Sequence, residues 1–169
     1  MSNILEYYTS FLRATEQAAI AAAKLRGCKD GKLADKAATE AMRSVLNGEP
    51  IHTRVVIGEG ERDDAPMLFI GEELGDKTSE IKIDIAVDPL ECTNHCAYDL
   101  PDSISVLAAA PKDALMGAPD TYMNKLCGSK ELSGHISLEN SVSENLSGAA
   151  KALNKDKKDL KIIVMDRDR

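Results

Sequence analysis

The sequence EIKIDIAVDPLECTNHCAYDLPDSISV, residues 80–106, contains the segment that decides the fold. Apolar residues alternate with Lys82, Asp84 and Ala86, and this period of two predicts a β-strand with one buried face. We expect the strand to end at Asp88, because Pro89 has no N–H to donate to a neighbouring strand. The apolar residues of the alternation are Ile81, Ile83, Ile85 and Val87.

Acidic and hydroxyl side chains follow this strand directly. Asp88 is followed three residues later by Glu91, and Cys92, Thr93 and Asn94 come next in a segment that can open either a helix or a tight loop. Carboxylates are ligands of Mg²⁺ and Mn²⁺, whereas exposed backbone N–H groups bind anions. The segment therefore predicts a hard cation that holds a phosphate.

Composition limits the classes of function. The chain of 169 residues is long enough for one domain with a core, and its net charge of −7 argues against a nucleic-acid partner. No apolar run approaches the roughly 18 residues of a membrane span, and residues 1–13 lack the layout of a signal peptide, so we expect no membrane partner and a cytoplasmic location. The four cysteines form no C-x-x-C pair, which favours free thiols over zinc or disulfides.

Two helices are expected before the central strand. Apolar residues recur at helical spacing over residues 3–26, where Gly27 supplies a stop, and over residues 33–47. Asp35 falls in the first turn of the second predicted helix. The side chain is either a metal ligand or an acid favoured there by the helix dipole, and the sequence pattern alone leaves both open.

A second acid lies where another predicted strand ends. Residues 54–58 have a strand pattern, and Glu59 follows between two glycines, so an unusual turn could aim it at a site or leave it solvated. If this strand lies beside the central one, Glu59 and Asp88 come close together. Glu72 and Glu73 are expected at the surface.

The remainder of the chain has fewer chemical signals. We expect a strand over residues 103–110, a helix opened by a capping box from Ser141 to Glu144 and ending near residue 153, and a strand over residues 160–165. Tyr122 either bonds a substrate phosphate or packs with its hydroxyl in water. The three histidines share no metal-ligand spacing.

Several stretches together resemble one family. The sequence DPLECT at 88–93 resembles the signature of the metal-dependent, lithium-sensitive phosphatases, Asp-Pro-hydrophobic-(Asp/Glu)-Gly-Thr. VVIGEGERDDAPMLFIGEE at 55–73, LADKAATEAMR at 33–43 and APDTYMNKL at 118–126 look like class II fructose-1,6-bisphosphatase. EQAAIAAAK at 16–24 and VMDR at 164–167 place the resemblance near the cyanobacterial fructose-1,6-/sedoheptulose-1,7-bisphosphatase branch.

The resemblance implies an α+β fold, a layered α/β sandwich of the sugar-phosphatase type, of which residues 1–169 would be the amino-terminal, metal-binding part, with the carboxyl-terminal half absent. It implies hydrolysis of the 1-phosphate of fructose 1,6-bisphosphate, and of sedoheptulose 1,7-bisphosphate in the cyanobacterial branch, with Mn²⁺ or Mg²⁺ as cofactor. A homo-oligomer, dimer or tetramer, is expected for the full-length enzyme.

The resemblance also assigns roles to individual residues. The metal ligands would be Asp35, Glu59, Asp88 and Glu91, with Glu59, Asp88 and Thr93 as the catalytic residues. The substrate contacts would come from Glu91, Cys92, Thr93, Tyr122 and Arg169.

Three departures from the family pattern bear on activity. Cys92 replaces the glycine before Thr93, Gly31 stands where the family's G-x-G-(D/E)-K loop has lysine, and the family's D-R-P-R-H segment reads DRDR at 166–169. Two other functions are therefore kept open. One is a related phosphatase acting on inositol phosphates or 3′-phosphoadenosine nucleotides, and the other is a catalytically silent fragment or regulatory subunit that binds metal or a partner.

Overall fold

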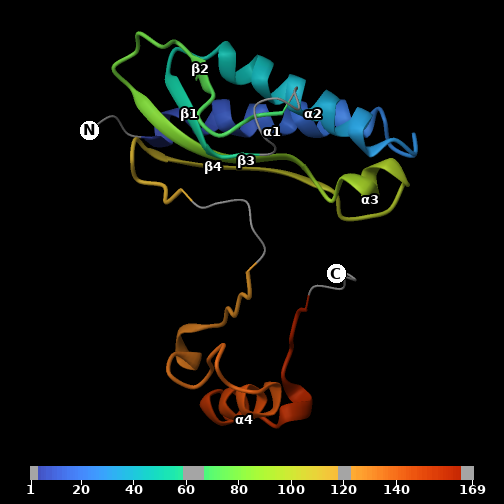
Figure 1. Ribbon diagram of the computed structural model, residues 1–169, viewed down its shortest axis with the longest axis vertical. Helices are drawn as coiled ribbons and strands as arrows, with labels where there is room; N and C mark the ends of the chain where they lie inside the picture. The colour runs from blue at the N-terminus through green and yellow to red at the C-terminus, as the bar shows by residue number, and fades with distance from the viewer. Residues whose placement is uncertain (1–3, 59–66, 118–122, 165–169) are drawn as a thin grey trace. The chain divides into compact units, whose positions relative to one another are not determined.

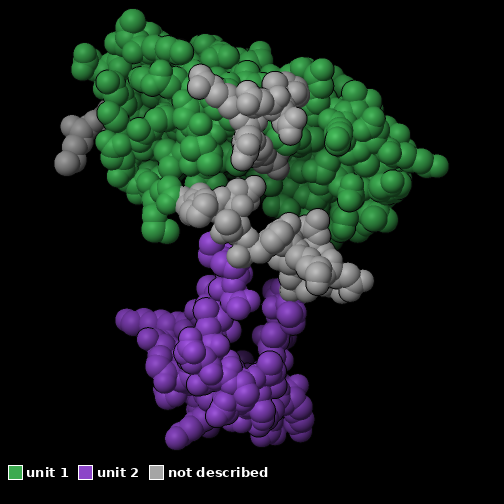
Figure 2. Space-filling model, in the orientation of Figure 1, with its two compact units in different colours: residues 1–119 green, residues 120–169 purple. Residues whose placement is uncertain are grey.

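The computed structural model describes residues 4–58, 67–117 and 123–164. The chain divides into two compact units, residues 1–119 and residues 120–169, which Figure 2 colours separately. Each unit has its own helices, and within the described ranges only the first unit contains a sheet.

Two helices open the first unit. A short 3₁₀ helix, η1 (Ile4–Tyr7), leads into α1 (Tyr8–Ala23), and α2 (Gly31–Asn47) follows after a short loop. Both helices lie where the apolar spacing predicts them, although α1 is shorter than expected and α2 begins two residues earlier. The side chain of Asp30 caps α2 by accepting the Leu33 N–H at 3.1 Å. Alanines at the buried positions of α1 let the two helices pack closely.

A four-stranded mixed sheet completes the first unit. Its strands are β1 (His52–Ile57), β2 (Glu73–Gly75), β3 (Lys82–Glu91) and β4 (Ile104–Pro111), in the order β2-β1-β3-β4. β1 and β3 run parallel, while the pairs β1–β2 and β3–β4 are antiparallel. Figure 1 shows α1 and α2 side by side along one face of this sheet. The structure therefore confirms a mixed α+β architecture.

The core lies between the sheet and the two helices. The alternation of β3 is confirmed on this face, where Ile83, Ile85 and Val87 are buried. The expectation for the opposite face is wrong at Asp84, which is also buried, because Arg54 on the neighbouring strand pairs with it. The larger side chains of the core are Phe11, Met42, Leu46, Ile51, Val55, Leu68, Leu74 and Leu90.

The prediction that Glu72 lies at the surface is also wrong. Its side chain is 12% exposed and accepts a bond from Arg43 Nε at 2.7 Å, and Arg43 also donates to the Met67 carbonyl at 2.6 Å. Arg43 belongs to α2, so this pair joins the helix to the segment before β2. Glu73 is exposed as expected. The short strand β2 itself has no alternating pattern long enough to be predicted.

The second unit is small and has one α-helix among its described residues, α4 (Val142–Ala152). The predicted capping box is confirmed, since the Glu144 N–H donates to Ser141 Oγ and the Glu144 carboxylate accepts the Ser141 N–H at 2.8 Å. Short 3₁₀ helices, η2 (Lys130–Leu132) and η3 (Lys157–Asp159), lie before and after it. The predicted strand at 160–165 is wrong over residues 160–164, which pair with no other strand, while Met165 lies outside the described residues.

Among the described residues, no helix is both long enough and apolar enough to cross a membrane.

Candidate active site

Asp88 and Glu91 lie at the end of β3, on either side of a break in its pairing with β4. Asp88 pairs with Val106 and Glu91 with Ile104, and the register shifts between the two pairs. The prediction that Pro89 ends the strand is therefore wrong, because the ladder is interrupted at the proline and resumes at Glu91. One oxygen of the Asp88 carboxylate accepts the Leu90 N–H at 3.1 Å, which fixes the carboxylate against its own strand.

Cys92 adopts the left-handed conformation, with φ 62° and ψ 49°. This conformation costs a residue with a Cβ roughly 1–2 kcal/mol. Its N–H donates to the Glu91 carboxylate at 3.1 Å, and its carbonyl accepts both the His95 N–H at 2.8 Å and the Ser103 hydroxyl at 3.0 Å. The Cys92 carbonyl therefore accepts two hydrogen bonds. Because the peptide between Cys92 and Thr93 is planar and trans, the Thr93 N–H points away from this carbonyl.

Thr93 is the first residue of the short helix α3 (Thr93–Ala97), so the segment left open as helix or loop is a helix. Its hydroxyl donates to the Leu90 carbonyl at 2.9 Å. A hydroxyl has one proton to donate and two lone pairs to accept with. In this arrangement Thr93 Oγ1 can serve a further partner only as an acceptor.

The loop between α1 and α2 holds the other end of α3. The Gly27 N–H donates to the Cys96 carbonyl at 2.9 Å, and the Lys29 N–H donates to the Ala97 carbonyl at 2.8 Å. These bonds satisfy carbonyls at the end of α3 that have no partner inside the helix. Lys29 itself has φ 62°, a conformation that favours glycine.

The structure places Asp35 differently from the sequence prediction. Because α2 begins at Gly31, Asp35 lies beyond the first turn, where the attraction of the helix dipole for an acid has largely faded. The position of Asp35 therefore argues against an acid that is present only because the helix dipole favours it. Helix α2 contacts α3, so the helix that carries Asp35 lies beside Thr93.

Several predicted site residues lie outside the described residues, namely Glu59, Tyr122 and Arg169. The strands that precede Glu59 and contain Asp88 are parallel neighbours, as the prediction of their proximity requires. Within residues 4–58, 67–117 and 123–164 no cluster of three or more acidic, histidine or cysteine side chains is placed to hold a metal ion. The donor type of the described acids fits a hard cation, since Asp35, Asp88 and Glu91 offer carboxylate oxygens.

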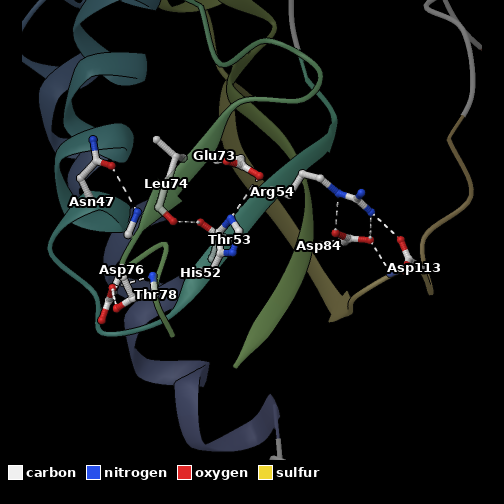
Figure 3. Close-up of polar contacts among 11 residues, drawn as sticks. Asn47, His52, Thr53, Arg54, Glu73, Leu74, Asp76, Thr78, Asp84 and Asp113 are labelled. Carbon is white, nitrogen blue, oxygen red and sulfur yellow. Dashed lines mark hydrogen bonds and ion pairs between the residues drawn. The ribbon is translucent and has the colours of Figure 1, made fainter. Parts of the chain in front are cut away.

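A polar network on the sheet was not predicted. Arg54 donates two hydrogen bonds to Asp84 and one to Asp113, and Figure 3 shows its guanidinium facing both carboxylates. The bond to Asp84, followed by that to Asp113, raises the pKa of Arg54. His52 lies beside Glu73 (Figure 3), and its Nε2 is 3.4 Å from Oε1 of the carboxylate. The network of Arg54, Asp84 and Asp113 stabilises the fold, because it joins β1 and β3 to the turn after β4.

Ser103 is another residue whose role was not predicted from the sequence. It directly precedes β4, and its hydroxyl reaches the Cys92 carbonyl from eleven residues away. A serine before a strand is common, and no pattern in the sequence distinguishes this one.

Comparison with known proteins identifies the relatives of the chain. A family model described as bacterial fructose-1,6-bisphosphatase, glpX-encoded, matches residues 5–169. Proteins named D-fructose 1,6-bisphosphatase class 2/sedoheptulose 1,7-bisphosphatase are 46% identical in Thermosynechococcus vestitus and in Synechocystis sp., and 45% identical in Synechococcus elongatus. Each alignment covers 94% of this chain and 49% of the relative, so the chain spans about half the length of the curated relatives it matches.

These matches agree with the geometry at the end of β3, where Asp88, Glu91 and Thr93 stand in the order of the phosphatase signature. The family is metal-dependent, and its sugar bisphosphatases act in carbohydrate metabolism. The chain belongs to the class II, glpX-type fructose-1,6-bisphosphatase family, of which it matches the amino-terminal portion.

Proposed function

We propose that this chain supplies the metal-binding part of an enzyme that hydrolyses the 1-phosphate of fructose 1,6-bisphosphate, with sedoheptulose 1,7-bisphosphate as a second substrate. The observation that carries the proposal is the junction of β3 with α3. There Asp88 and Glu91 flank the break in the strand, and Thr93 opens the helix that contacts α2. The names of the relatives support the choice of sugar bisphosphates.

In this proposal the cation, Mn²⁺ or Mg²⁺, is held by Asp35, Glu59, Asp88 and Glu91. It would neutralise the charge of the transferring phosphoryl group and make a water more acidic. Four carboxylates gathered without a cation would repel one another, so the metal also stabilises the local structure. Residues 1–169 would thus form the amino-terminal, metal-binding part of the whole fold.

Thr93 has a defined role in this proposal. Because its hydroxyl proton is bound to the Leu90 carbonyl, Oγ1 accepts a hydrogen bond from the attacking water and orients that water. Asp88 and Glu59 are the candidates to accept a proton from it. The N–H of Thr93, with the backbone of residues 91–93, would bind the 1-phosphate.

Substrate contacts from Tyr122 and Arg169 complete the proposed site. Since the relatives are about twice as long as this chain, we propose that the rest of the family fold supplies further contacts to the sugar bisphosphate. The chain by itself would then hydrolyse the substrate slowly or not at all. In the whole enzyme the protomers would form a dimer or tetramer in the cytoplasm.

Metal binding is tested by calorimetry on this chain. Asp88→Ala should weaken Mn²⁺ binding at least tenfold, because Asp88 lies at the centre of the proposed ligand set. Glu80→Ala is the matched control, since Glu80 is an exposed acid just before the same strand. Equal affinity of the Asp88 variant and the wild type would remove Asp88 from the ligand set.

Activity is tested by phosphate release in Mn²⁺. The chain should be assayed alone and mixed with the carboxyl-terminal half of the Thermosynechococcus vestitus relative. We expect the mixture to hydrolyse fructose 1,6-bisphosphate with inhibition by Li⁺, and Thr93→Ala to lower kcat far more than metal affinity. Preferred hydrolysis of inositol monophosphate or 3′-phosphoadenosine 5′-phosphate would contradict the proposed substrate, and no release in the mixture would favour a silent metal-binding module.

A further inference from the structure

Three basic side chains lie in a row across the sheet, on the face opposite to α1 and α2. In β3, Ile83 is buried in the core with the helices, so the side chain of Lys82 projects from the other face. His52 on β1 is the register partner of Lys82. Lys112 follows Pro111, the partner of Ile83 on β4, and its N–H donates to the Lys82 carbonyl at 3.2 Å. The basic row is therefore His52, Lys82 and Lys112.

The two lysines of the basic row face each other across neighbouring strands. Side chains directly opposite each other on an antiparallel pair have Cβ atoms about 4.5–5.5 Å apart, and like charges at such positions are destabilising. Neither Lys82 nor Lys112 forms an ion pair with a residue that the structure describes. A negatively charged ligand bound by both lysines would replace this repulsion with attraction.

His52 contributes hydrogen-bonding atoms that are not satisfied. Its side chain is 14% exposed, and both ring nitrogens are buried without a hydrogen-bond partner among the described residues. Glu73 lies 3.4 Å from Nε2 but does not form a hydrogen bond with it. Buried polar atoms are nearly always bonded, and a bound ion or water is one explanation of an exception. The imidazole therefore points independently to a polar ligand beside the lysines.

A cavity of about 140 Å³ is lined by the basic row, by Arg54 and by the acids Glu73 and Asp84. A water molecule needs roughly 10–15 Å³ of such space, so an ion of the size of phosphate has room. The acids do not cancel the lysines, because Asp84 is paired with Arg54 and Glu73 lies beside His52. The hydrogen bonds of Arg54 to described residues come from Nε and Nη2, which leaves the N–H groups of Nη1 for a ligand.

We propose that the basic row binds a phosphate ion in this cavity. The two lysines supply the positive charge, and the imidazole and Arg54 supply directed hydrogen bonds, which are strongest when the acceptor is ionised. The site is separate from the candidate active site. Lys82 precedes Asp88 by six residues on the same strand, and a rise of about 3.3 Å per residue separates the two by roughly 20 Å. Binding requires neither the cation nor the sugar bisphosphate of the proposed function.

Binding is tested by NMR on the isotope-labelled, metal-free chain, titrated at constant pH with sodium phosphate and, at equal ionic strength, with sodium chloride. We expect saturable shifts of the Lys82 and Lys112 amides and of the His52 ring in phosphate alone. Lys82→Ala and Lys112→Ala should each weaken binding roughly tenfold. Lys77→Ala is the matched control, because it removes an exposed lysine from the turn before β3. Equal effects of the two salts, or shifts confined to residues 91–93, would overturn the proposal.

A charge reversal tests the repulsion between the two lysines. Lys82→Glu places an acid between two basic side chains, so its thermal midpoint in chloride should exceed that of the wild type. In phosphate at roughly ten times its Kd, the wild-type midpoint should rise by about 3–6 °C, whereas that of Lys82→Glu should not respond. A lower midpoint of Lys82→Glu in chloride, or an equal response of both proteins to phosphate, would overturn the proposal.

Discussion

Arg54 and Asp84 lie opposite each other on the parallel strands β1 and β3, and the guanidinium donates two hydrogen bonds to the carboxylate. The distances are 3.0 Å from Nε to Oδ1 and 2.8 Å from Nη2 to Oδ2. The Asp84 side chain is 1% exposed, whereas that of Arg54 is 37% exposed. The Asp113 N–H also donates to Asp84, at 2.6 Å, so the buried carboxylate depends on groups from two other segments.

Removing Arg54 should therefore be costly. Arg54→Met leaves a buried carboxylate without its counter-charge, and we expect the free energy of unfolding to fall by about 3 kcal/mol, the lower end of the range for broken buried pairs. Urea denaturation measures the change. The double variant Arg54→Met with Asp84→Asn should recover most of the loss, because no unpaired charge remains. Arg26→Met is the control, since the Arg26–Asp99 pair is exposed and should contribute less than about 1 kcal/mol. Similar losses for Arg26→Met and Arg54→Met would contradict this account.

Cys92 and Lys29 share the left-handed conformation, each with φ 62°. Replacing either with glycine should raise the free energy of unfolding by about 1 kcal/mol, because the strain of the Cβ is relieved. Cys28→Gly is the matched control. Cys28 adjoins Lys29 and does not have positive φ, so glycine there should destabilise the chain. A loss of stability in Cys92→Gly would show that the thiol contributes more than the strain costs.

Cys96 should react more slowly than the other three thiols. Burial raises the pKa of the Cys96 thiol, with a smaller contribution from Cys28, and the thiolate is the reactive form. Cys28, Cys92 and Cys127 are exposed. A short pulse of iodoacetamide followed by mass spectrometry should find these three alkylated first and Cys96 protected, with the difference disappearing in urea. Equal labelling of Cys96 and Cys28 in the folded chain would contradict the burial.

The cap of α4 should depend on pH. Bonds from the Ser141 hydroxyl and N–H lower the pKa of the Glu144 carboxyl. A carboxyl whose pKa is lowered by folding contributes stability above its unfolded pKa of about 4.3, and this stability is lost as the pH falls through the folded pKa. The amide shift of Ser141 should therefore be constant near neutral pH and change only in acid. Glu144→Gln should abolish that titration while keeping a capping side chain, and a wild-type shift that changes near neutral pH would rule the capping box out as its cause.

The parts of the fold that depend on nearby residues were predictable from the sequence. The periods of β3, α1 and α2 and the capping box of α4 are set within one turn or one strand, so their patterns identify them. The strand prediction is wrong over residues 160–164, because a strand also needs a neighbour to pair with and a pattern of apolar residues contains no information about one. The prediction that β3 ends at Pro89 is wrong for a related reason, since the pairing of β3 with β4 resumes after the proline.

In the candidate site, too, the residues of a local motif were predictable, whereas residues that depend on distant partners were not. Asp88, Glu91 and Thr93 are contiguous enough to be located by a linear motif, and the family resemblance marks position 92 as one where glycine is usual. The burial of Asp84 and Glu72 was not predictable, because their partners Arg54 and Arg43 are about thirty residues away. The packing of α2 on α3 joins segments even farther apart in the sequence, and no local pattern predicts it.

The bonds that Gly27 and Lys29 make to the end of α3 bear on the order in which the chain folds. A helix of five residues has no stability in water by itself. α3 is bound by a loop that is synthesised well before it, so we expect the signature segment to take its native form only after the α1–α2 hairpin has formed. We therefore expect substitutions in that loop to slow the folding of the signature segment, although they change none of the acids of the candidate site.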